Sequence, residues 1–171
     1  MTFFCKDIVL GKDMHPHALF RFAATLRARD ILEKMKSFAS NDSLRVGMLY
    51  GLRRTGKSVL LRQWLLALPH EEQERAAYIT IDDESMADVK KDLSTLHSHG
   101  YKYVVVDEIT ACPDFIDCSA ALANKYAGSG MKLFICGTDS LSLWLALTDG
   151  LFDREYTLHT THNVRKDHSI L

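Results

Sequence analysis

The stretch Gly51–Ser58, GLRRTGKS, combines two glycines, three cations and a small hydroxyl residue immediately before an apolar run. It has the pattern G-x-x-x-x-G-K-S of the Walker A phosphate loop. Glycines let main-chain N–H groups approach phosphate oxygens, and the start of a following helix adds unpaired N–H groups and the positive end of a dipole. The residue types therefore predict a site for a nucleotide polyphosphate.

Two side chains of the loop have the chemistry that a magnesium nucleotide requires. Lys57 supplies a mobile positive charge for the β and γ phosphates, and the Ser58 hydroxyl is small and hard enough to bind Mg²⁺. Arg53 and Arg54 have two interpretations: an electrostatic role toward the nucleotide, or a solvated pair at the tip of a loop. The predicted nucleotide contacts are Gly51, Leu52, Arg53, Arg54, Thr55, Gly56, Lys57, Ser58 and Val59.

A second pair of candidate residues follows the apolar run Val104–Val106. Asp107 and Glu108 end this run, and two acids are costly in a core but favourable beside a metal ion. Asp107 is placed to hold Mg²⁺ through water, as a Walker B aspartate does, and Glu108 to orient the attacking water. The alternative is a strand that simply ends in a polar loop. Because the pair follows a phosphate loop in an alternating chain, the pattern favours catalysis.

Segments with the pattern of strands alternate along the chain with segments that have the pattern of helices. The expected strands are 45–50, 76–81, 103–106, 131–136 and 155–159. The expected helices are 16–39, 57–68, 85–97, 112–127 and 141–147. Such alternation predicts an α/β fold, with a parallel sheet covered by helices on both faces and ligands at the carboxyl ends of the strands.

The overall composition limits the classes of function. A chain of 171 residues with a formal net charge of −1 and a pI near 6.7 can build one core, but has no general basic field for nucleic acid or anionic membranes. Its four cysteines lack zinc-type spacing, which predicts reduced, mostly buried thiols. The sequence has the pattern of neither a signal peptide nor a membrane span, so we expect a soluble, cytoplasmic protein without a membrane partner.

Four stretches occur in order along the chain: GLRRTGKS, YKYVVVDEIT, CGTDSLSLWLA and DGLFDREYTLHTTH. Together they resemble the prokaryotic AAA-type ATPases that combine an AAA domain with a separate C-terminal domain, over roughly residues 40–168. The resemblance implies a P-loop NTPase three-layer sandwich with a central parallel five-stranded sheet in the order 5-1-4-3-2. It also implies an ATPase core over 43–171. The N-terminal segment 1–42 contains an amphipathic helix, which the helical spacing of its apolar residues predicts.

The resemblance also suggests roles for three residues outside the two motifs. Thr138 and Asp139, just past the strand 131–136, match the sensor 1 position between phosphate and water, and both also suit a helix N-cap. Arg154 matches an arginine finger that would act on a neighbouring subunit and stabilise charge on the γ-phosphate. A homo-oligomer would follow from that role. The alternative for Arg154 is an ordinary surface cation.

Similar proteins continue into a helical lid and a further domain, whereas this sequence ends at Leu171. We therefore expect the lid and the C-terminal domain to be absent, and no lid arginine is assigned. The resemblance implies ATP and Mg²⁺ as cofactors and hydrolysis of ATP to ADP and phosphate. Nucleic acid is not indicated as a partner by this chain, and would bind through the absent domain.

Two other classes of function use the same phosphate loop. A non-hydrolysing nucleotide-dependent switch or interaction module would bind ATP without turnover because the lid is missing. A small-molecule kinase would need a cluster of lid arginines and an acceptor pocket, for which the sequence after Thr138 offers no candidates. The sequence thus favours an ATPase, with the switch as its main alternative.

Overall fold

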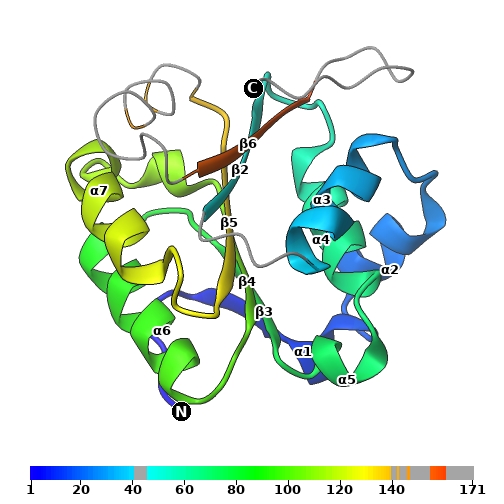
Figure 1. The fold of residues 1–171 in the computed structure, drawn as a ribbon, viewed down its shortest axis with the longest axis horizontal. Helices are drawn as coiled ribbons and strands as arrows, with labels where there is room; N and C mark the ends of the chain where they lie inside the picture. The colour runs from blue at the N-terminus through cyan, green and yellow to red at the C-terminus, as the bar shows by residue number, and fades with distance from the viewer. Residues whose placement is uncertain (41–45, 140–141, 143–145, 147–154, 161–171) are drawn as a thin grey trace.

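A six-stranded sheet lies at the centre of the structure, with helices on both of its faces (Figure 1). The computed structural model describes residues 1–40, 46–139, 142, 146 and 155–160. The strands are β1 (Asp7–Leu10), β2 (Val46–Gly51), β3 (Ala76–Thr80), β4 (Tyr103–Asp107), β5 (Lys132–Gly137) and β6 (Glu155–Thr160). The helices are α1 (Gly11–Met14), α2 (Ala18–Thr25), α3 (Ile31–Ser40), α4 (Lys57–Leu66), α5 (His70–Gln73), α6 (Met86–Ser98), η1 (Ile109–Ala111) and α7 (Phe115–Tyr126). The predicted α/β class is confirmed.

The strands follow one another across the sheet in the order β1-β3-β4-β5-β2-β6. All neighbouring strands are parallel except β1 and β3. The five expected strands therefore lie in the predicted order, with β5 between β2 and β4. The predicted total of five strands is wrong, because β1 adds an antiparallel strand at the edge next to β3.

Each central strand contributes alternate side chains to two hydrophobic cores. On β4, Val104 and Val106 pack on the side of α6 and α7, whereas Tyr103 and Val105 pack on the side of α2, α3 and α4. Successive residues of a strand point to opposite faces, so a strand covered on both faces must be apolar at every position. Trp64 on α4 is fully buried in the second core.

The single amphipathic helix that the sequence predicts near the N-terminus is in fact two helices, α2 and α3. Leu26 has an extended backbone, with φ of −87° and ψ of 148°, and ends α2. The side-chain amide of Gln63 on α4 donates to the carbonyls of Ala23 and Leu26, at 3.0 and 2.9 Å, which satisfies carbonyls that a helix end leaves free. The break also shifts the pattern of burial: Phe20 is buried, whereas Phe22 is 57% exposed. Tertiary contacts therefore override the helical periodicity.

Strand β1 is held at the edge of the sheet by two buried carboxylates. Asp92 on α6, which is fully buried, accepts the backbone N–H groups of Phe4 and Cys5, with its closest contact at 2.7 Å. Glu84 accepts the backbone N–H of Lys6 at 3.0 Å. Burial alone would raise the pKa of the Glu84 carboxyl, but hydrogen bonds from backbone N–H groups outweigh burial and lower this pKa. Both acids are distant from β1 in sequence, so the local pattern did not reveal the strand.

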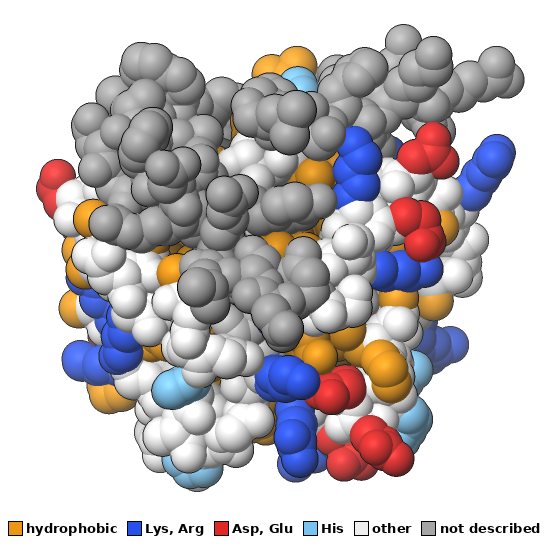
Figure 2. Space-filling view, in the orientation of Figure 1, with side chains coloured by type: hydrophobic (Ala, Val, Ile, Leu, Met, Phe, Trp, Pro, Cys, Tyr) orange, Lys and Arg blue, Asp and Glu red, His pale blue; other side chains and the backbone are white. Residues whose placement is uncertain are grey.

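The surface and the thiols agree with the composition. Figure 2 shows both Lys or Arg and Asp or Glu side chains on the face in view. All four cysteines are free, and Cys5, Cys112 and Cys136 are buried, as predicted. In the part of the chain that the structure describes, no helix has the length and apolar character for crossing a bilayer.

Replacing Asp92 by alanine removes the acceptor of the backbone N–H groups of Phe4 and Cys5, which lie just before β1. We expect Asp92→Ala to lower the free energy of unfolding by about 2 kcal/mol, because buried donors lose their partner. Urea denaturation followed by circular dichroism measures this change. The control is Asp117→Ala on the exposed surface of α7, which should change the free energy by less than about 1 kcal/mol. Equal effects of the two variants would contradict the assigned role.

Candidate functional site

The loop between β2 and α4 closes around the side chain of Lys57. The Lys57 Nζ donates to the carbonyl oxygens of Gly51 and Leu52, at 2.8 and 2.9 Å, and the residue is only 4% exposed. Buried charges require partners, and here the loop itself provides them. An ammonium group has three N–H donors, so these two bonds leave one for a phosphate oxygen. Loop and lysine therefore stabilise each other in a preformed arrangement.

Side chains from two distant segments fix the middle of the loop at Thr55. The Thr55 hydroxyl donates to the carbonyl of Leu52 at 2.8 Å and lies 2.7 Å from Oγ1 of Thr160 on β6. The guanidinium of Arg29, between α2 and α3, donates to the Thr55 carbonyl at 2.5 Å. Sequence reasoning missed both partners. Thr160 could have been found from its place at the carboxyl end of a strand, but nothing local marks Arg29.

Several residues of the site have left-handed backbone conformations. Among the described residues, Arg54 and Glu108 are the two non-glycine residues with positive φ, at 64° and 61°. Gly56, just before α4, has φ of 83°, which glycine adopts without steric penalty. Gly51 has φ of 149°, and a Cβ there would lie 2.4 Å from the carbonyl oxygen of Thr160. Both glycines of the motif are thus required by the backbone geometry.

Asp107 is 1% exposed and points to the side of the sheet that α4 covers, because it lies two residues after Val105. Its Oδ2 accepts a hydrogen bond from the hydroxyl of Tyr78 on β3, a residue that sequence reasoning missed. Its Oδ1 is buried without a hydrogen-bond partner. Burial, and then the charge of Asp107, raise the pKa of Tyr78 well above its ordinary value, so the hydroxyl remains a donor.

Glu108 and Thr138 contact each other at the ends of two neighbouring strands. Thr138 follows β5, and its hydroxyl donates to Oε2 of Glu108 at 3.0 Å. The left-handed backbone of Glu108 turns the chain directly after β4 into η1. Backbone conformations of this kind carry strain and are found preferentially at functional sites. The structure therefore brings together the predicted base and the predicted sensor residue.

The charges of both motifs surround Cys136 on β5. Burial raises the pKa of the Cys136 thiol well above its ordinary value, and the nearby carboxylates of Asp107 and Glu108 raise it further, while the Lys57 ammonium acts in the opposite direction. Because β5 lies between β2 and β4, the backbones of β2 and β4 are about 10 Å apart. The lysine of one motif and the acids of the other thus meet at the carboxyl edge of the sheet.

The donor set fits a magnesium ion that is bound together with phosphate. Among the described residues there is no group of three or more His, Cys, Asp or Glu side chains that could hold a metal by themselves. Mg²⁺ in phosphate sites keeps several waters and takes only one or two protein oxygens. The unpaired Oδ1 of Asp107 and the hydroxyl of Ser58, in the first turn of α4 on the same side of the sheet, are oxygens of this kind.

Other predicted residues of the site have different outcomes. The Asp139 carboxylate accepts the backbone N–H of Ser142 at 3.2 Å, which is the geometry of a helix N-cap. Arg53 and Arg54 are exposed at the tip of the loop, which agrees with either of their interpretations. Outside the described residues lie Arg154 and most of the predicted helix 141–147.

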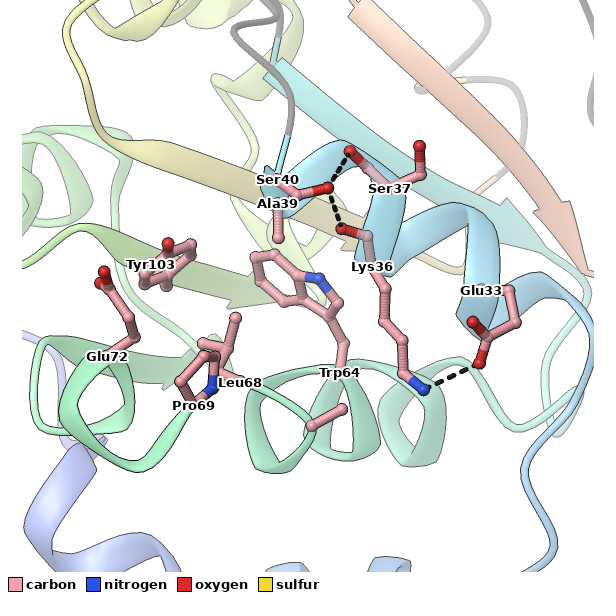
Figure 3. Close-up of a pocket in the computed structure, with 11 residues that line it drawn as sticks. Glu33, Lys36, Ser37, Ala39, Ser40, Trp64, Leu68, Pro69, Glu72 and Tyr103 are labelled. Carbon is pink, nitrogen blue, oxygen red and sulfur yellow. Dashed lines mark hydrogen bonds and ion pairs between the residues drawn. The ribbon is translucent and has the colours of Figure 1, made fainter.

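A separate pocket of about 530 Å³ lies at the opposite end of the strands (Figure 3). Its wall contains Trp64 from the last turn of α4, Leu68 just after that helix, and Tyr103, the first residue of β4. An ion pair between Lys36 and Glu33, at 2.8 Å, lies on its rim. No residue of the two motifs lines this pocket. Because ligands of parallel sheets bind at the carboxyl ends of the strands, the pocket is distinct from the phosphate site.

Solved structures have the same fold. PCH-2 from C. elegans matches with a TM-score of 0.55 and 13% sequence identity, over 93% of this chain and 51% of that chain. Hsp104 from S. cerevisiae, in its extended complex with casein, matches with a TM-score of 0.55 and 13% identity, over 84% of this chain and 29% of that chain. The chain therefore spans about half of the length of the first structure and less than a third of the second.

The amino-acid sequence also matches a family model, described as an AAA domain, over residues 44–162. No curated protein matches the chain. The matched range is more than half of the chain and includes the phosphate loop, Asp107, Glu108 and Thr138. The chain therefore belongs to the AAA domain family, and the site at the carboxyl edge of its sheet lies in an AAA-type ATPase domain.

Proposed function

We propose that this chain binds ATP with Mg²⁺ and hydrolyses it to ADP and phosphate. One observation carries the proposal: a buried lysine wrapped by its own loop lies at the same edge of the sheet as a buried aspartate with an unpaired oxygen. A cation for phosphate beside an anion for metal is the arrangement that a magnesium nucleotide needs. Membership of the AAA domain family supports ATP as the nucleotide.

In this proposal the loop and the first turn of α4 bind the nucleotide. The backbone N–H groups of residues 51–58 surround the β and γ phosphates, and Lys57 donates to a phosphate oxygen. Ser58 and Asp107 hold Mg²⁺, which when bound neutralises charge on the phosphates. Arg53 and Arg54, exposed at the loop tip, add positive charge near the entrance of the site.

Glu108 orients the attacking water in this proposal and accepts its proton. Thr138, which bonds to Glu108, lies where it can hold the carboxylate toward the water. Asp139 shapes the turn that carries Thr138. An Arg154 from a neighbouring copy would stabilise charge on the γ-phosphate, so a homo-oligomer belongs to the proposal. The N-terminal segment 1–42 supports the core 43–171 from outside the family match.

The contact between Thr138 and Glu108 favours a second candidate, a non-hydrolysing nucleotide switch. The hydroxyl of Thr138 donates a hydrogen bond to Oε2 of Glu108 at 3.0 Å. This oxygen is one of the two that could accept a proton from water. In this candidate the contact holds the carboxylate away from the attacking water, so that ATP binds without turnover. Measurement of phosphate release therefore separates the two candidates.

We expect Lys57→Ala and Glu108→Gln to separate binding from hydrolysis. Removal of the Lys57 charge should weaken ATP binding by at least about tenfold, because a charge-assisted hydrogen bond to phosphate is lost. Glu108→Gln should retain binding but lower the rate of phosphate release by about 100-fold, because the amide accepts no proton. Isothermal titration calorimetry and a phosphate-release assay measure the two effects.

Lys36→Ala and Glu33→Gln are matched controls, because this pair lies on the rim of the separate pocket. Both controls should bind and hydrolyse ATP like the wild type. A wild type that binds ATP but releases phosphate at the same rate as Glu108→Gln would support the switch and refute hydrolysis. A wild type that does not bind ATP would refute both candidates.

A methyl group at Gly51 should disrupt the loop. We expect Gly51→Ala to lower the free energy of unfolding by about 2–4 kcal/mol, because its Cβ would overlap the backbone of Thr160. ATP binding should weaken with it. Gly100→Ala is the control: Gly100 also has positive φ, at 82°, but a Cβ there meets nothing within 4 Å. This control should cost about 1–2 kcal/mol and leave ATP affinity unchanged, whereas equal affinities in both variants would contradict the assigned loop geometry.

A further inference from the structure

We propose that Tyr78 is a positioning residue of the metal site, whose hydroxyl fixes the Asp107 carboxylate so that one chosen oxygen faces the bound cation. The inference rests on the proposed function, since it concerns how the same site holds Mg²⁺. Tyr78 lies on β3, outside both motifs, and is 1% exposed. Its hydroxyl donates to Oδ2 of Asp107, while Oδ1 has no hydrogen-bond partner.

The register of the sheet places Tyr78 for this contact. In the parallel pair of β3 and β4, Tyr78 lies opposite Val105 and Thr80 lies opposite Asp107. Alternate residues of a strand share a face, so Tyr78, Val105 and Asp107 all point to the side of α4. Side chains of a strand lean along its direction, which lets a long phenol ring reach a carboxylate two residues farther on. The contact thus follows from a tyrosine at this position of β3.

Two neighbouring side chains hold the ring of Tyr78 in place. Phe20 on α2 meets it edge to face, with ring centroids 5.5 Å apart and an interplanar angle of 80°. The guanidinium of Arg62 lies 4.8 Å from the centre of the same ring. Arg62 belongs to α4, one helical turn after Ser58. The ring is therefore packed between the helix that begins at the phosphate loop and the helix of the N-terminal segment.

The bond to Tyr78 determines which oxygen Asp107 presents. A free carboxylate exchanges its two oxygens by rotation about the bond to its Cβ. With Oδ2 held by the hydroxyl, Oδ1 is the oxygen whose lone pairs remain for a cation or its bound water. A ligand that is already oriented binds a metal more tightly than one that must first be ordered. The Tyr78 hydroxyl should therefore strengthen nucleotide binding only when Mg²⁺ is present.

The test compares Tyr78→Phe with the wild type in calorimetric titrations with ATP, once with Mg²⁺ and once with EDTA. The dissociation constant in EDTA divided by the dissociation constant with Mg²⁺ reports the contribution of the metal. We expect Tyr78→Phe to reduce this ratio by about tenfold, and to leave the dissociation constant in EDTA within about twofold of the wild type. Phe20→Leu, which loosens the ring but keeps the hydroxyl, should reduce the ratio in the same direction by a smaller factor.

Tyr126→Phe is the matched control, because it removes a buried tyrosine hydroxyl from α7, on the other side of the sheet. Its ratio should equal that of the wild type. Weaker binding of Tyr78→Phe by the same factor with and without Mg²⁺, or no change in either, overturns the inference. A wild type that binds ATP without any gain from Mg²⁺ overturns it and leaves nucleotide binding standing. A wild type that does not bind ATP overturns this inference and the proposed function together.

Discussion

Two buried charges of opposite sign, Lys57 and Asp107, place the strongest constraint on the carboxyl edge of the sheet. Both residues are nearly inaccessible to water, and a buried charge without partners is severely destabilising. The loop carbonyls satisfy Lys57 on one side, and the Tyr78 hydroxyl satisfies one oxygen of Asp107. Lys57 retains one N–H donor, and Asp107 retains an oxygen without a hydrogen-bond partner. The surrounding elements must hold these partners in place, because any displacement would leave a charge unpaired in the core.

The N-terminal helices contribute to this support. Arg29 donates to the carbonyl of Thr55 in the phosphate loop, and Phe20 packs against the ring of Tyr78. Gln63 on α4 ties the end of α2 to the helix that follows the loop. These contacts join the segment before β2 to both halves of the site. The family match begins at residue 44, so this support comes from outside the matched range.

The parallel sheet makes the site possible by aligning the carboxyl ends of β2, β4 and β5 at one edge. Charged residues are excluded from the interior of β4, since its side chains enter both cores, and they appear only at its last position. The side chain of Asp107 therefore points to the same face of the sheet as Val105, which is the face that α4 covers. Glu108, one residue later and with a left-handed backbone, leaves the strand and reaches Thr138. Two adjacent acids thus acquire different surroundings.

The sequence by itself determined the class of fold and the place of the phosphate loop, because hydrophobic periodicity and glycine spacing are local properties. The order of the five parallel strands followed only from the resemblance to AAA-type ATPases. It also indicated Lys57 and Asp107, whose neighbours in sequence define their motifs. Only the tertiary structure decided the partners of these residues. Tyr78, Arg29 and the edge strand β1 could not be predicted, since their roles depend on hydrogen bonds to residues that are 26 or more positions away in the chain. Such contacts form only when the packing of sheet and helices brings distant segments together, and no local pattern encodes them.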